Sequence, residues 1–244
     1  MGVGSFEDLD GTEEFLRMHL DMNKSDTNNA SNINVYRDLS KILRIRGNMP
    51  EAEEMFRKHL AIQEKIGSID QIAKAYNKLG DILRIREKLD GAEEFHRNAL
   101  MIFENLGRQD GIADSYDGLG VVLQKRGRLE ASEQMHQRSL TINEVLCRPG
   151  QIACNYRNLG IVMQNRGSLD DAEALYRKSL IINQTLGWVE GIAFDYGNLG
   201  SILVARGNLL GAKAMWTRSC DLFAKLGSRH MVADVQDQIK KLIN

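Results

Sequence analysis

The stretch SYDGLGVVLQKRG, residues 115–127, contains residue types that could bind a phosphate group. Gly118 and Gly120 precede an apolar run and two basic residues, and closely spaced glycines let backbone N–H groups approach a phosphate. A phosphate loop, however, needs its glycines between a strand and a helix, and no strand pattern precedes Gly118. Gly120 also belongs to a series of evenly spaced glycines, with Gly80, Gly160 and Gly200. The sequence therefore argues against a nucleotide site here.

The histidines do not form a metal-binding pattern. His96 and His136 belong to a series of positions 40 residues apart along the chain. The other members of the series are Phe56, Tyr176 and Trp216. This position is therefore predicted to be an aromatic packing position. The remaining histidines are scattered, and the sequence contains no HExxH motif. We expect no metal site.

The cysteines and recurring glutamates also favour structural roles. Three cysteines are an odd number and too few for a disulfide scaffold. Glu53, Glu93, Glu133 and Glu173 fall in the predicted first turn of a helix, where the helix dipole favours a negative charge. No catalytic constellation emerges, so the sequence predicts that the protein is not an enzyme and has no cofactor.

Composition restricts the possible partners. The 244 residues carry a net charge of −1, with 43% hydrophobic and 27% charged residues, which does not indicate nucleic-acid or membrane binding. No apolar run approaches the ~20 residues that cross a bilayer, and the N-terminal residues lack the pattern of a secretory signal. We expect a cytoplasmic location. The two prolines permit long helices.

An internal repeat organises the chain. Its copies begin at evenly spaced tyrosines and are YRDLSKIL (36–43), YNKLGDIL (76–83), YDGLGVVL (116–123), YRNLGIVM (156–163) and YGNLGSIL (196–203). Five units therefore span residues 31–230. In the second unit, apolar residues at steps of 3 and 4 predict a helix A over 71–86 and a helix B over 89–106.

The turns between helices have recognisable signals. "RG" recurs at 46–47, 126–127, 166–167 and 206–207, and glycine suits the left-handed position that ends a helix. Asn48, Ser168 and Asn208 then stand where they could cap helix B.

This pattern resembles the tetratricopeptide repeat. Leu79, Gly80, Ala92 and the large ring at position 96 match that family in type and spacing, with each unit stretched from about 34 to about 40 residues. The 40-residue units are similar to those of kinesin light chains and spindle-orientation adaptors. The resemblance implies an all-α fold, a right-handed superhelical solenoid of antiparallel helix pairs. It also implies that the A helices line a concave groove that binds peptides.

The ends extend this organisation into three predicted parts. Residues 8–22 align with 88–102, so residues 1–30 are predicted to hold a half-repeat with only helix B, followed by a polar connector. Residues 31–230 hold the five units. Residues 231–244 continue the register as a capping helix with a polar outer face.

Positions whose residue recurs in every unit are expected to pack the repeats together. We therefore expect a ligand to bind to the face of helix A whose residues differ from unit to unit. In tetratricopeptide families this face lines the groove. The predicted groove residues are Arg37, Lys41, Arg44, Lys74, Asn77, Asp81, Arg84, Asp117, Val121, Gln124, Arg157, Ile161, Gln164, Phe194, Ser201 and Val204.

The charge on this face is graded along the chain. The first two units contribute five positive residues against one negative, whereas the fifth contributes no charge and offers Phe194 and Val204. The sequence thus predicts a non-catalytic scaffold for a protein or peptide partner with an acidic end and an apolar end. Solvation alone is the competing explanation for the charges.

Two other functions stay open at this point. The half-repeat leaves Phe15, Leu16 and Leu20 partly uncovered, which could make the protein a self-assembling structural module, a homo-oligomer. The chain could also be the sensor part of a bacterial peptide-responsive regulator. Carboxylate-clamp relatives, which grip chaperone tails, have asparagine just after the motif glycine, where this chain has Asp81 in one unit. Chaperone-tail binding is therefore not expected.

Overall fold

The computed structural model describes residues 6–22 and 32–242, and within them every regular element is an α-helix. These residues form twelve helices, and consecutive helices pack in pairs. The predicted all-α class is confirmed. The polar connector predicted after residue 22 lies mostly outside the described residues. The chain divides into two compact units, Met1–Gly118 and Leu119–Asn244, and the division falls inside one helix.

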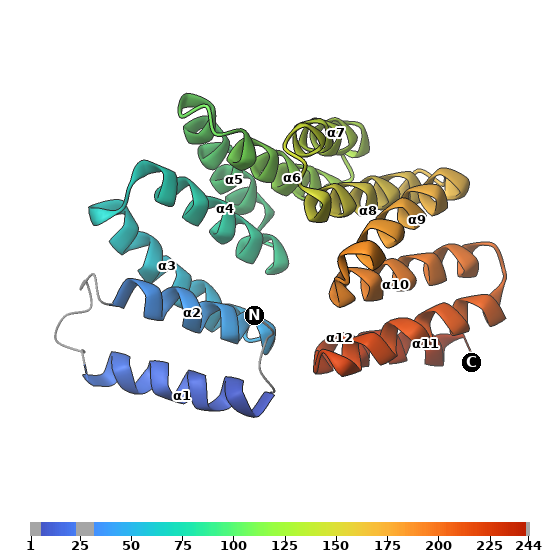
Figure 1. Cartoon of the computed structure of the whole chain (residues 1–244), viewed down its shortest axis with the longest axis horizontal. Coiled ribbons are helices and arrows are strands. Elements are labelled where there is room, and N and C mark those ends of the chain that lie inside the picture. The colour runs from blue at the N-terminus through green and yellow to red at the C-terminus, as the bar shows by residue number, and fades with distance from the viewer. Residues whose placement is uncertain (1–5, 23–31, 243–244) are drawn as a thin grey trace. The chain divides into compact units, whose positions relative to one another are not determined.

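The first unit begins with the helix of the predicted half-repeat. Its helices are α1 (Phe6–Met22), α2 (Asn32–Ile45), α3 (Met49–Ile66), α4 (Ile69–Ile85), α5 (Leu89–Asn105) and the first part of α6 (Gln109–Lys125). Helices α2 and α3 pack together as a hairpin, as do α4 and α5 (Figure 1). These pairs are the A and B helices predicted from the repeat.

The second unit continues the same alternation. After the end of α6 it contains α7 (Leu129–Val145), α8 (Pro149–Asn165), α9 (Leu169–Leu186), α10 (Val189–Ala205), α11 (Leu209–Lys225) and α12 (Arg229–Lys241). Helices α8 and α9 form one hairpin and α10 and α11 the next (Figure 1). Helix α12 packs on α11.

In four repeats a ring from helix B lies against a glycine of helix A, whereas the first repeat has Ser40 in place of that glycine. A Cβ added at Gly160 would lie 2.6 Å from the ring of Tyr176, and one at Gly200 would lie 2.4 Å from Trp216. Gly120 meets His136 in the same way. The recurring glycine therefore permits close helix packing, and the histidine occupies the predicted ring position.

Most turns between helix A and helix B have a glycine in the left-handed conformation, as predicted, and one has glutamate instead. The glycines of the four "RG" turns have φ between 73° and 84°. In the second repeat Glu87 adopts φ 57° in the same left-handed region without being glycine. Asn48 and Asn208 cap their helices through side-chain oxygens, whereas Ser168 occupies the cap position without a side-chain hydrogen bond. Ser168 is therefore the N-cap residue, as predicted, but its side chain makes no capping hydrogen bond.

The recurring glutamates of helix B pair with the recurring arginines that end the next helix A. Arg86 binds Glu53, Arg206 binds Glu173, and Arg166 Nη1 lies 2.5 Å from Glu133 Oε2. These partners are 33 residues apart in each case. The pairs join consecutive repeats, a role beyond the dipole contribution inferred from sequence.

Helix α1 packs on the first full repeat through part of its apolar face. Leu16 and Leu20 contact the core cluster that contains Tyr36 and Leu39. Phe15, in contrast, is 59% exposed. Leu16 and Leu20 are only partly buried against this core, so both stay partly uncovered, as expected.

Buried polar triads join helix B to the following helix A in the second unit. Asn155 Nδ2 donates to Ser139 Oγ at 3.0 Å, and its Oδ1 accepts from Asn143 at 2.9 Å. One repeat later Asp195 takes the place of Asn155. Its carboxylate accepts from Ser179 at 2.9 Å and from Asn183 at 2.6 Å, and it is fully buried. Burial raises the pKa of Asp195, although the Arg157 charge and these hydrogen bonds act against that rise.

We predict that Gly160→Ala lowers the free energy of unfolding by about 1–3 kcal/mol, because the added methyl would overlap a fully buried ring. Tyr176 has little freedom to move, since its hydroxyl donates to Gln164 at 2.8 Å. Urea denaturation measures the change. Gly150→Ala in the same helix is the control, because nothing lies within 4 Å of its Cβ position. Equal stability of the two variants would contradict the packing argument.

We also predict that Asp195→Asn stabilises the protein by on the order of 1 kcal/mol at about pH 7.5 and that the gain shrinks toward about pH 4. The folded-state pKa is raised, so the ionised carboxylate costs stability once the pH exceeds the unfolded-state pKa. The variant reproduces the neutral triad of Asn155. Denaturation at a series of pH values measures the gain.

The reciprocal variant Asn155→Asp is the matched control. It buries a carboxylate where the chain has an amide, so it should be less stable than the parent protein at about pH 7.5 and recover on acidification. A stability difference that does not change with pH in either variant would show that charge burial is not the cause.

Candidate functional site

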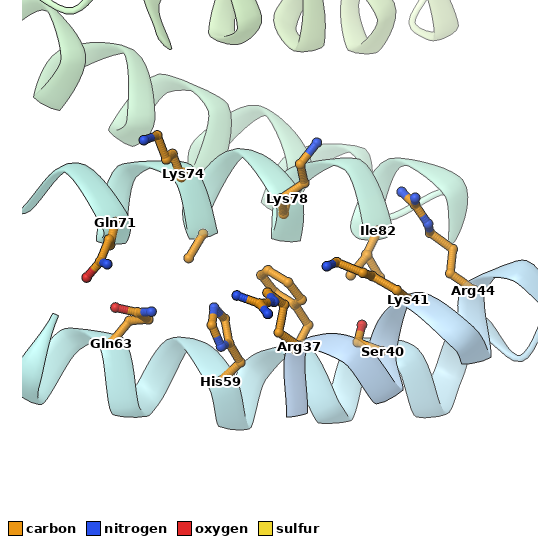
Figure 2. A pocket seen from close by; sticks show the side chains of 12 residues that line it. Arg37, Ser40, Lys41, Arg44, His59, Gln63, Gln71, Lys74, Lys78 and Ile82 are labelled. Carbon is orange, nitrogen blue, oxygen red and sulfur yellow. The ribbon is translucent and has the colours of Figure 1, made fainter. Parts of the chain in front are cut away.

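A cavity of about 330 Å³ lies among α2, α3 and α4 in the first unit. It is lined by Arg37, Ser40, Lys41, Arg44, Phe56, His59, Gln63, Gln71, Lys74, Ala75, Lys78 and Ile82. Five of these residues are basic and none is acidic. The cavity therefore combines the apolar side chains of Phe56, Ala75 and Ile82 with a strongly positive lining (Figure 2).

Helix α2 supplies three of the basic residues, spaced so that they share one helix face. Arg37 Nε and Lys41 Nζ contact Asp38 Oδ1 at 3.0 and 2.9 Å. Burial alone would raise the pKa of Asp38, but the hydrogen bonds from these two cations outweigh it and lower the pKa. Asp38 thus stays ionised and holds both cations in place. Arg44 follows one turn later on α2.

Helix α4 supplies the other two basic residues. Lys74 pairs with Asp70 at 2.7 Å, and Lys78 lies 3.7 Å from Asp81. Figure 2 shows their amines pointing away from the centre of the cavity, whereas Lys41 extends toward it. Lys74 and Lys78 are 54% and 65% exposed, so they contribute positive charge at the rim of the site.

Helix α3 forms the floor with His59 and Gln63, both of which are buried. His59 Nδ1 lies 2.8 Å from the carbonyl oxygen of Ile33, which fixes the ring, and the ring also packs on Phe56 at 5.0 Å between centroids. In Figure 2 the His59 ring points into the cavity beside the guanidinium of Arg37.

The structure brings together four of the predicted groove residues of the first unit and separates the others. Arg37, Lys41, Arg44 and Lys74 line the cavity. Asn77 is instead buried, where it donates to Ser115 at 2.8 Å and accepts from His96 at 3.0 Å. The other predicted groove residues of this unit do not line the cavity and are partly exposed; they are Asp81, Arg84 and Asp117.

Several of the predicted residues in the second unit lie on α8 and α10. Arg157 stacks over the ring of Phe194 at 5.3 Å, and Phe194 packs edge-on against Phe223 at 5.1 Å. Val204 packs on the same core cluster. The other predicted residues here, all partly buried, are Val121, Gln124, Ile161, Gln164 and Ser201. Phe194 therefore contacts both the guanidinium of Arg157 and the core ring of Phe223.

The sequence reasoning missed Lys78, His59 and Gln63. The departure of His59 from the other full repeats carries a signal: its equivalents are Ala99, Ser139, Ser179 and Ser219 there, although the N-terminal half-repeat has His19. A small residue suffices for packing at that position. A histidine there therefore indicates another role.

Other kinds of site are not apparent in the part of the chain that the structure describes. No group of three His, Cys, Asp or Glu side chains there is placed to hold a metal ion. None of the described helices has the length and apolar character to cross a membrane.

Comparison with known families gives two matches. Models of the tetratricopeptide repeat match residues 71–144 and 156–187. No match is found among curated proteins.

Solved structures give further matches at low sequence identity. BtubC (BKLC) from P. vanneervenii is 19% identical, with 91% of this chain and 90% of that chain covered and a TM-score of 0.62. The Rap conjugation gene regulator of plasmid pLS20, solved with the Phr* peptide, is 16% identical with a TM-score of 0.75, covering 84% of this chain and 57% of that one.

A third structure contains the TPR-like repeats of a putative kinesin light chain from Podosopora anserina. It is 17% identical, covers 80% of this chain and 97% of that chain, and has a TM-score of 0.56. These structures share the fold of stacked helical hairpins. The two family-model matches identify tetratricopeptide repeats at residues 71–144 and 156–187, and the hairpins described above have the same fold of stacked helix pairs.

Proposed function

We propose that the protein is a non-catalytic binding module that holds an acidic segment of a peptide or protein partner in the cavity among α2, α3 and α4. The observation that carries this proposal is the lining of five basic residues without an acidic one. Charge complementarity of this kind favours encounter with acidic partners and disfavours basic ones.

The acids next to the cavity support this proposal rather than neutralise the site. Asp38 and Asp70 each hold basic side chains from the same helix, and their contacts are partly exposed to solvent. Exposed pairs of this kind contribute little stability, about 0–1 kcal/mol. They nevertheless restrict the cations before a ligand arrives, which lowers the entropy cost of binding.

The second unit offers an apolar contact of its own. Phe194 and Val204 are partly exposed on α10, and they would contact an apolar part of a partner. The Rap structure with the Phr* peptide shows that a protein of similar fold binds a peptide, which is consistent with this assignment.

The test of the proposal is a double charge reversal, Arg37→Glu with Lys41→Glu. A fluorescent eight-glutamate peptide should bind the parent protein at low salt and lose affinity by about tenfold or more in the variant, because attraction becomes repulsion. Fluorescence anisotropy measures the affinity, and circular dichroism checks that the helices are retained.

A matched control carries the same change in charge elsewhere in the first unit. Lys58→Glu with Lys65→Glu alters two exposed residues of α3 that do not line the cavity. If this control weakens binding as much as the cavity variant does, net charge alone explains the attraction. The cavity would then not be the binding site.

Self-assembly is a second candidate because Phe15, Met18 and Met22 of α1 are 59%, 46% and 73% exposed. An apolar strip on a terminal helix can pair with a second copy of the chain. Light scattering over a concentration series should then show a dimer that Phe15→Ser with Met18→Ser dissociates. A monomer at every concentration would exclude this function.

A further inference from the structure

His59 differs from the other groups that line the cavity because it can change its charge near neutral pH. It is 5% exposed, its ring is aimed into the cavity, and it departs from the small residue found at this position in the other four full repeats. The repeat fold does not require a histidine here. The ring is therefore available to interact with a ligand in the cavity.

The hydrogen bond to Ile33 fixes which nitrogen is protonated. A carbonyl oxygen only accepts, so His59 Nδ1 must carry the hydrogen that it shares with Ile33 at 2.8 Å. In the neutral ring the other nitrogen, Nε2, is then an acceptor with a lone pair. A carboxylate ligand also only accepts, so neutral His59 has nothing to donate to it.

The surroundings of the ring also favour neutral His59 when no ligand is bound. Burial lowers the pKa of His59; the hydrogen bond to Ile33 and the charge of Asp38 raise it, and Arg37 and Lys41 lower it. Lys74 and Lys78 on α4 and Arg44 on α2 add further positive charge to the cavity lining, and Gln63 and Gln71 are uncharged. The empty cavity thus favours the neutral ring.

We propose that a carboxylate bound in this cavity is hydrogen-bonded by His59 and that its binding is coupled to the uptake of one proton by His59 Nε2. The bound negative charge offsets the surrounding cations and gives the new N–H an acceptor. His59 is then a ligand-binding residue, and affinity for acidic segments increases as the pH falls. This inference rests on the proposed function.

The experiment uses the eight-glutamate peptide, because its carboxylates stay ionised while histidine titrates. The peptide should bind roughly tenfold more tightly at about pH 6 than at about pH 8. His59→Gln should remove most of that difference, and His230→Gln, which alters an exposed histidine on α12, should keep it.

A second measurement follows the titration of His59 in the unaltered protein. In NMR titrations of the unaltered protein, the His59 ring resonance, assigned by its absence from the His59→Gln spectrum, should show a higher pKa with the peptide bound. Peptide binding without a rise in this pKa, or a pH dependence that persists in His59→Gln, overturns the inference and leaves the proposed function standing. Failure of the peptide to bind at either pH overturns both.

Discussion

The close contact between a helix B ring and a helix A glycine is the constraint on which the rest of the structure depends. It brings the two helices of a hairpin together at the same point in successive units, as Gly160 with Tyr176 and Gly200 with Trp216 show. Because this point keeps the same place in each repeat, the pairs between glutamate and arginine also recur. One steric requirement thereby sets the register of the interactions between repeats.

The candidate site lies where the first repeat departs from that regularity. His59 and Gln63 stand on helix B at positions where other units have small or different buried residues, and both reach the cavity between two A helices. Packing alone is satisfied by Ala99 or Ser139 at the equivalent of His59. His59 and Gln63, the polar side chains on the floor of this cationic cavity, are therefore not needed for packing of the repeat.

The sequence predicted the fold well because its repeat is strict. Helix positions, turn glycines and the ring position all follow from one unbroken period, and the cations of α2 follow from helical spacing. Asn77 shows the limit of that spacing, because steps of 3 and 4 only approximate 3.6 residues per turn. Its side chain turns inward to His96 and Ser115.

His59 was missed for a different reason. A groove face read from helix A alone contains no residue of helix B, and only the packing of α2, α3 and α4 shows that a B-helix side chain reaches the space between two A helices. Such floor residues are more buried than the rim lysines, so their interactions with a ligand are less screened by water and salt. Rim cations therefore govern attraction at a distance, whereas the buried ring governs which ionic form the bound complex adopts.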